Sequence, residues 1–173
     1  MIIKGDCMKI MPELAAESFD TCVTSPPYWG LRDYGIPPSE WPEVTYSPMA
    51  GLPPITVPAW EGCLGLEPTP EMFVAHMVLV FREVWRLLRK DGTLWVNFGD
   101  SYASSPANKQ DENWTDPANP KKGGRVLDPF GGSGTTLKVA HENNRECTII
   151  ELGEQYVEIA ELRTAVVQPV LNI

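Results

Sequence analysis

A glycine-rich turn between a strand-like and a helix-like segment constrains the fold of this chain more than any other feature. It covers residues 128–136, Asp-Pro-Phe-Gly-Gly-Ser-Gly-Thr-Thr, and it follows the β-rich segment 125–128. Glycines at such a point let the backbone turn sharply and approach a ligand closely. A Walker loop and a nucleophile elbow are both excluded, because neither Gly-Lys-Ser/Thr nor Gly-x-Ser-x-Gly occurs in the segment. We call residues 128–136 the glycine turn.

An acidic residue lies at the spacing that nucleotide-binding sheets use. Glu151 is 20 residues after Gly131 and ends the next predicted strand. Rossmann-like folds place an acid there on ribose hydroxyls, so the pattern predicts a ligand of the adenosine type. The alternative is an ordinary glycine turn beside a solvated glutamate.

Strand-like and helix-like segments alternate along most of the chain. This alternation predicts an α/β fold, a Rossmann-like doubly wound sheet in a single domain over residues 1–173. The strongest helix start is Thr69-Pro70, with a capping hydroxyl followed by proline in the first turn. Strands are predicted at 1–4, 20–24, 93–98, 125–128 and 146–150, and helices at 7–16, 70–89, 134–143 and 154–165.

Two segments interrupt this pattern. Nine of the 17 prolines fall within residues 37–70, and residues 33–81 contain no Lys or Arg. The 37–70 segment is therefore interpreted as a long irregular excursion. The polar stretch 103–124 is interpreted as a linker, which leaves a half at 1–102 and a second half at 125–173.

A second unusual motif follows the predicted strand 20–24. Residues 25–28 read Ser-Pro-Pro-Tyr, and we call them the proline strip. Two prolines stiffen the backbone into an extended turn, Ser25 offers an oxygen, and Tyr28 offers an aromatic face. Such a strip suits a flat polar group such as a flipped nucleobase. The alternative is a proline-rich loop with a packed aromatic ring.

The proline strip followed by the glycine turn resembles the amino-methylating DNA methyltransferases, in the permuted β-type order. The resemblance implies S-adenosylmethionine as cofactor, DNA as substrate, and methyl transfer to cytosine N4 or adenine N6. Asp6 matches an acid that the family places near the cofactor adenine, and Glu151 matches its ribose acid. The implied catalytic residues are Ser25, Pro26, Pro27 and Tyr28. The implied cofactor-binding residues are Asp6, Asp128, Phe130, Gly131, Gly132, Ser133, Gly134, Thr135 and Glu151.

The resemblance also implies how the chemistry works. An aryl amine is a poor nucleophile, and Ser25 and the Pro26 carbonyl would accept its hydrogens while Tyr28 stacks on the base. The sulfonium of the cofactor is already activated, so neither a metal nor a covalent nucleophile is expected, and orientation supplies most of the rate. Serine at the first position of the strip favours cytosine N4 over adenine N6.

The chain departs from the family between residues 102 and 126, where family members carry further strands and a target-recognition region. The formal net charge of −9 also means that DNA contacts have to come from a local patch. Three hypotheses follow: a site-specific methyltransferase of restriction–modification type, a non-catalytic or partner-dependent remnant that binds the cofactor only, and an unrelated Rossmann oxidoreductase. If the lost strands leave a sheet edge open, a homodimer formed by edge pairing is expected.

Other residues carry weaker predictions. Four scattered cysteines without a Cys-x-x-Cys pair favour the cytoplasm, and no apolar run is long enough to span a membrane. His76 is expected to be a core or surface residue rather than a ligand, and Trp85 is expected in the core. Trp41 and Trp60 are expected in loops, where they are candidates for stacking on a base.

Overall fold

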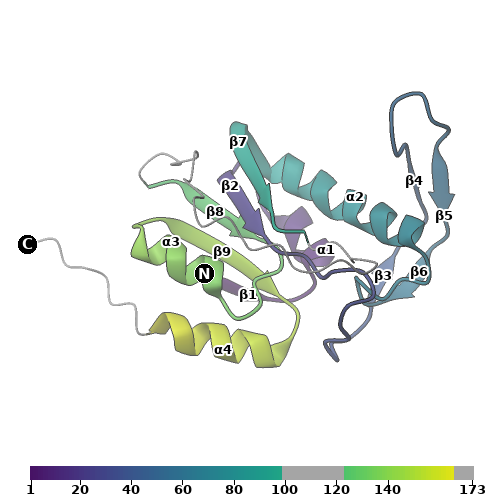
Figure 1. The fold of residues 1–173 in the computed structure, drawn as a ribbon. Helices are drawn as coiled ribbons and strands as arrows, with labels where there is room; N and C mark the ends of the chain where they lie inside the picture. Colours follow the sequence, from purple (N-terminus) through teal and green to yellow (C-terminus); the bar gives the residue numbers. More distant parts are fainter. Residues whose placement is uncertain (99–122, 166–173) are drawn as a thin grey trace, which may run out of the picture.

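A five-stranded parallel sheet organises the computed structural model, which describes residues 1–98 and 123–165 (Figure 1). Its spatial order is β1-β9-β8-β2-β7, and every neighbouring pair is parallel. The two halves of the sequence therefore share one sheet, because β8 from the second half lies between β9 and β2. The strands are β1 (Ile2–Lys4), β2 (Phe19–Thr24), β7 (Leu88–Val96), β8 (Arg125–Asp128) and β9 (Glu146–Glu151).

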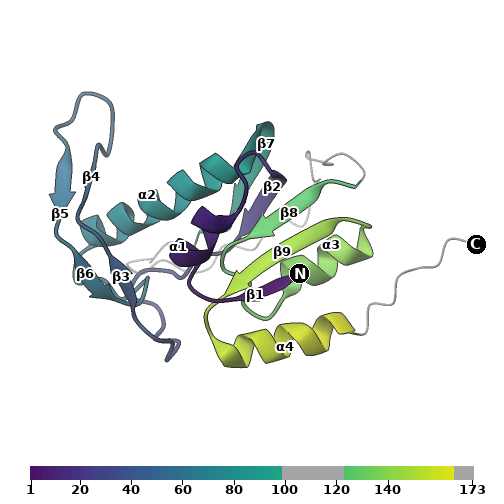
Figure 2. The same ribbon diagram turned by 180° about the vertical axis from the view of Figure 1, so that it is seen from behind.

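Helices cover both faces of this sheet, as the prediction of a doubly wound fold requires (Figure 2). Side chains alternate along the strands: Leu127 of β8 joins the core under α1 and α2, while Val126 joins the core under α3 and α4. Ile150 and Ile149 of β9 divide in the same way, since successive strand residues point to opposite faces. The helices are α1 (Cys7–Ile10), a 3-10 turn (Met11–Glu13), α2 (Pro70–Leu87), α3 (Thr135–Glu142) and α4 (Glu154–Ala165).

Helix α2 begins where the sequence predicts and ends earlier than predicted. Thr69 Oγ1 accepts a hydrogen bond from the Met72 amide at 3.3 Å, which caps the first turn. At the other end the amides of Glu17 and Ser18 donate to the carbonyls of Arg86 and Leu87, which terminates the helix at Leu87. The predictions of a helix to residue 89 and of a strand from residue 93 are thus wrong, because β7 starts at Leu88.

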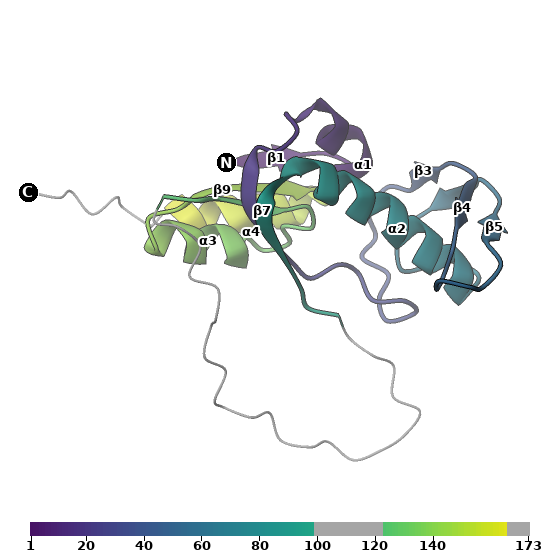
Figure 3. The same cartoon turned by 90° about the horizontal axis from the view of Figure 1, so that it is seen from above.

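The segment predicted as an irregular excursion contains an antiparallel ribbon, and that prediction is corrected. Its strands are β3 (Ser39–Trp41), β4 (Val44–Tyr46), β5 (Ile55–Val57) and β6 (Trp60–Gly62). The pairs Trp41–Trp60 and Val44–Val57 continue one register across Pro42 and Pro58, which lack amide donors. We call residues 39–62 the ribbon. Figure 3 shows it beside the N-terminal part of α2, at one side of the main sheet.

The remaining boundaries differ from the predictions by a few residues. The first helix is shorter than predicted, since only Cys7–Ile10 is α-helical and Met11–Glu13 forms a 3-10 turn. Trp85, predicted in the core, is 81% exposed on the outer face of α2. The linker prediction for 103–124 falls outside the described residues except for its last two positions. Among the described helices, none combines the length and the apolar character of a membrane span.

Candidate active site

One pocket lies at the carboxyl ends of four neighbouring parallel strands, where α/β sheets bind their ligands. Segments that follow β1, β9, β8 and β2 all contribute to its wall. Another side is closed by Tyr34 and Ile36, which follow the strip, and by residues of the excursion between Pro37 and Leu64. Six of the residues predicted for the site line this pocket: Asp6, Ser25, Pro27, Phe130, Gly132 and Glu151.

The glycines of the glycine turn have different roles. A Cβ on Gly131 would lie 2.8 Å from the Cβ of Ile149, and one on Gly134 would lie 2.8 Å from the Cβ of Ala160. These two positions therefore let the turn pack against β9 and α4. Gly132 has a φ of +49°, a Cβ there would meet only the Phe130 carbonyl oxygen at 3.9 Å, and among the glycines of the turn it is the one that lines the pocket. Ser133 and Thr135 accept hydrogen bonds from the Arg163 side chain, outside the pocket.

Two carboxylates face the pocket from neighbouring strands. Asp6 follows β1, and its Oδ1 accepts from the Met8 amide at 2.8 Å, which caps α1. Glu151 ends β9, and its two oxygens accept from the Gly132 and Gly153 amides, each at 2.7 Å. Within residues 1–98 and 123–165, the contacts that fix both carboxylates come from backbone amides. The site consequently offers two oriented anionic groups on one wall, as hydroxyl or amine groups of a ligand require.

Asp128 is buried behind the pocket and joins the two predicted motifs. Its Oδ1 accepts from Thr24 Oγ1 at 2.8 Å and from the Phe130 amide at 3.1 Å. Thr24 directly precedes the proline strip, so this carboxylate ties the start of the strip to the glycine turn. Burial raises the pKa of the Asp128 carboxyl, and hydrogen bonds from Thr136, Thr24 and the Phe130 amide partly offset that effect.

The proline strip extends from the end of β2 along the pocket. Pro26 is fully buried, Ser25 is exposed, and Ser25 Oγ lies 3.3 Å from the Tyr28 hydroxyl. The Tyr28 ring packs at 6.2 Å from the ring of Phe98, outside the pocket lining. The strip thus presents two hydroxyls and one aromatic ring close together.

Several pocket residues were missed from the sequence. Tyr34 and Tyr156 meet edge to face, with ring centroids 6.2 Å apart, and both line the pocket. Tyr156 lies in the first turn of α4, five residues after Glu151, and this proximity to a strand end is the signal that could have found it. Tyr34 carries no such local signal, because it comes from the irregular chain after the strip. Cys7 also lines the pocket, and burial raises the pKa of its thiol, which makes it unsuited as a nucleophile.

The tryptophans predicted to lie in loops occupy other positions. Trp41 is buried in β3, and Trp60 is half-buried in β6. Their rings stack with the imidazole of His76, at centroid distances of 4.5 and 5.5 Å. The prediction that they are loop residues is wrong, since the ribbon turns them towards α2. His76 is a buried core residue, in line with its prediction.

Comparison with known proteins identifies the family. A family model described as DNA methylase (N6_N4_Mtase) matches residues 19–119 and 112–162. The chain belongs to this DNA methylase family. The resemblance inferred from the proline strip and the glycine turn is therefore confirmed.

Curated relatives match part of this DNA methylase chain. Type II methyltransferase M.SmaI of Serratia marcescens is 40% identical over 103 residues, which cover 60% of this chain and 27% of M.SmaI. M.XycI of Xanthomonas campestris pv. cyanopsidis is 39% identical over 103 residues, or 60% of this chain and 26% of M.XycI. The matched region thus spans about a quarter of the length of these relatives.

Solved structures share the methylase fold. The putative DNA modification methylase TTHA0409 of Thermus thermophilus aligns with a TM-score of 0.62 at 19% identity, over 98% of this chain and 96% of that one. A second structure of TTHA0409 is complexed with S-adenosyl-L-methionine. The cytosine-N4-specific PvuII DNA methyltransferase aligns with a TM-score of 0.58 at 15% identity, over 94% and 85% of the two chains. These likenesses confirm the predicted α/β methyltransferase fold.

The buried Asp128 carboxyl predicts a specific pH dependence of stability. Because its pKa is raised in the folded state, the wild-type free energy of unfolding has a contribution that is full below the unfolded pKa, roughly 3.9, and is lost as pH rises through the folded pKa. Asp128→Asn keeps an oxygen for Thr24 and does not titrate. Urea unfolding between pH 4 and pH 8 should show wild type losing stability relative to D128N as pH rises. A pH-independent difference would contradict the raised pKa.

Proposed function

We propose that this chain is an S-adenosylmethionine-dependent DNA amino-methyltransferase, acting on cytosine N4 in preference to adenine N6 of a flipped base. The observation that carries the proposal is that Ser25 and Pro27 of the proline strip line the same pocket as Asp6, Phe130 and Glu151. The groups proposed to bind the cofactor and the groups proposed to bind the base thus line one cavity. The proposal treats residues 1–173 as one methyltransferase domain, with 1–102 and 125–173 as its two halves.

The proposed cofactor site uses the wall formed by the ends of β1, β8 and β9. Asp6 and Glu151 would accept hydrogen bonds from the polar groups of the adenosine, and Phe130 would cover its apolar surface. Gly132 leaves room for a close approach, because no side chain occupies that part of the turn. Bound S-adenosylmethionine supplies a methyl group that its sulfonium already activates, and the protein contributes orientation.

The proposed base site uses the proline strip. Ser25 Oγ and the Pro26 carbonyl would accept the hydrogens of the exocyclic amine, which directs its lone pair towards the methyl group. Tyr28 would stack on the flipped base. The buried Pro26 and the Thr24–Asp128 hydrogen bond hold the strip in place, so these groups need little rearrangement on binding. With DNA as substrate, the proposed setting is site-specific modification of restriction–modification type in the cytoplasm.

A second candidate is a non-catalytic or partner-dependent protein that binds S-adenosylmethionine only. The observation that favours it is that the match spans about a quarter of the length of M.SmaI and M.XycI. The two candidates share the cofactor site and differ in turnover. Methyl transfer by the chain alone therefore separates them.

The main prediction is methyl transfer to DNA. The chain is incubated with labelled S-adenosylmethionine and mixed-sequence DNA, and digested nucleosides are analysed by mass spectrometry. N4-methylcytosine is expected, and Ser25→Ala should lower kcat by roughly 10²-fold, as removal of one preorganised hydrogen-bonding group does. Ser18→Ala, outside the pocket, is the matched control. Labelled N6-methyladenine would contradict the base preference, and absence of label from folded, cofactor-binding protein would favour the second candidate.

Cofactor affinity provides an independent prediction. Glu151→Gln should weaken S-adenosylmethionine binding about tenfold or more, because a charged acceptor is lost and the new amide opposes a backbone N–H. Glu154→Gln is the control, since Glu154 is exposed and pairs with Lys4 at 2.6 Å. Isothermal titration calorimetry gives both dissociation constants. Equal affinities of wild type and E151Q would remove Glu151 from the proposed site.

We also propose a homodimer formed through β7, an edge strand of the described sheet. Leu94 and Val96 of this strand are 42% and 38% exposed, so the edge carries apolar side chains. Light scattering should give twice the mass of the chain, and Leu94→Lys should reduce it to one chain. Leu162→Lys, on the exposed face of α4, should leave the dimer intact. A wild-type monomer would contradict the dimer.

A further inference from the structure

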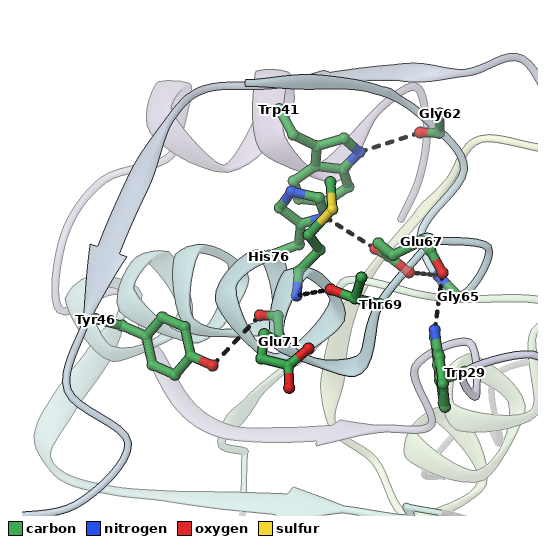
Figure 4. Close-up of polar contacts among 10 residues, drawn as sticks. Trp29, Trp41, Tyr46, Gly62, Gly65, Glu67, Thr69, Glu71 and His76 are labelled. Atoms are coloured by element: carbon green, nitrogen blue, oxygen red, sulfur yellow. Dashed lines mark hydrogen bonds and ion pairs between the residues drawn. The ribbon is translucent and has the colours of Figure 1, made fainter. Parts of the chain in front are cut away.

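A buried polar pair lies outside the pocket, between the excursion and α2. The side chains of Glu67 and His76 are fully buried, and Glu67 Oε1 lies 2.9 Å from His76 Nδ1 (Figure 4). A buried carboxylate and imidazole lose their hydration, and that loss is tolerated only where hydrogen bonds replace it. The contacts of Glu67 therefore indicate what the pair does.

Glu67 connects directly to the chain that follows the proline strip. Its Oε2 accepts from the Gly65 amide at 2.8 Å, and its main-chain carbonyl accepts from Trp29 Nε1 at 3.0 Å (Figure 4). The Gly65 carbonyl in turn accepts from the Gly30 amide at 2.7 Å. One carboxylate thus fixes the turn 65–67, and the carbonyls of that turn fix the two residues immediately after Tyr28.

The turn also lies against the strip without an intervening side chain. Gly65 has a φ of +94°, and a Cβ there would lie 3.1 Å from the Tyr28 carbonyl oxygen and 3.2 Å from the Pro27 Cβ. The backbone of the turn therefore packs directly on the strip. A displacement of the turn would therefore also displace Pro27 and Tyr28, because close-packed atoms transmit strain.

His76 anchors this arrangement to α2 and to the ribbon. Its ring stacks with Trp41 at an interplanar angle of 20° and with Trp60 at 11°. Its Nε2 has no hydrogen-bond partner among the described residues, and an unsatisfied buried nitrogen costs stability. An apolar residue would avoid that cost, so the imidazole is explained by what its Nδ1 does for Glu67.

We propose that Glu67 and His76 are positioning residues, which hold the proline strip in the geometry for methyl transfer. This inference rests on the proposed function for its catalytic consequence, while its structural part stands alone. Small misplacements of reacting groups lower rates strongly. The competing explanation is that the pair only stabilises the excursion.

The test compares three variants by amide hydrogen exchange and by kinetics. Glu67→Gln keeps an oxygen for the Gly65 amide and an amide nitrogen for His76, whereas Glu67→Ala keeps neither. Val57→Ala is the stability control, because Val57 is buried in the apolar cluster between the ribbon and α2, to which no residue of the turn 65–67 belongs. Exchange at Gly30 and Gly65 needs neither DNA nor turnover, so it tests the positioning even if wild type proves inactive.

The expected result is a local effect that the conservative variant rescues. E67A should raise exchange at Gly30 and Gly65 by about tenfold or more, while exchange in β8 and β9 stays unchanged. If the wild-type protein is active, the kcat of E67A should be at least about tenfold lower, with an unchanged dissociation constant for S-adenosylmethionine. The E67Q variant should retain most of the wild-type activity. V57A should lower the melting temperature and leave Gly30 exchange and kcat unchanged.

Two results would overturn the inference. The first is unchanged exchange at Gly30 in folded E67A, and the second is a V57A effect on Gly30 and kcat as large as that of E67A. If E67A does not fold, His76→Leu removes the imidazole that contacts Glu67 Oε1, and unchanged exchange at Gly30 and Gly65 in H76L would equally overturn the inference. If the wild-type protein shows no turnover but the variants show the expected exchange pattern, the proposed function is contradicted and the positioning role is not.

Discussion

The parallel pairing of β2 with β8 is the contact on which the rest of the structure depends. It joins strands that are about a hundred residues apart in sequence, with Thr21 opposite Val126 and Cys22 opposite Leu127. Because parallel strands end at the same edge of a sheet, this register brings the proline strip and the glycine turn together. The Thr24–Asp128 hydrogen bond closes the pairing at that edge, behind the pocket. A methylase whose motifs occur in the permuted order thus brings its two motifs together by strand adjacency.

The features that sequence predicts well are those with local physical causes. The glycine turn, the cap at Thr69 and the strand before the proline strip each carry their signal within a few residues. The end of α2 does not, because the amides of Glu17 and Ser18 decide it from a distant part of the chain. The ribbon escaped prediction because its strands are three residues long and lie among prolines, although 44–46 and 55–57 are β-rich. Tyr34 and the Glu67–His76 pair depend on tertiary contacts, and no local pattern marks them.

The residues of the glycine turn form one motif in the sequence, but in the structure some of them serve packing and others face the pocket. The glycine turn matches a cofactor loop as a whole, yet Gly131 and Gly134 leave room for Ile149 and Ala160, whereas Gly132 faces the pocket. Asp128 likewise supports the turn from behind rather than lining the cavity. Part of the motif is therefore needed to fold the pocket wall, and substitutions at Gly131 or Gly134 would disturb the proposed cofactor site through packing.

The excursion holds the proline strip in position and contributes no positive charge. Residues 33–81 contain no Lys or Arg, so this segment has no cations with which to bind DNA phosphates. What it has is a ribbon packed on α2, two indole rings stacked on His76, and a turn whose backbone lies against Pro27 and Tyr28. Helix α2 packs on the same sheet that carries the strip on β2. The strip is consequently fixed at both ends, by Asp128 before it and by the Glu67 turn after it. The proposed base site would therefore have its acceptors and its aromatic ring in place before a base binds.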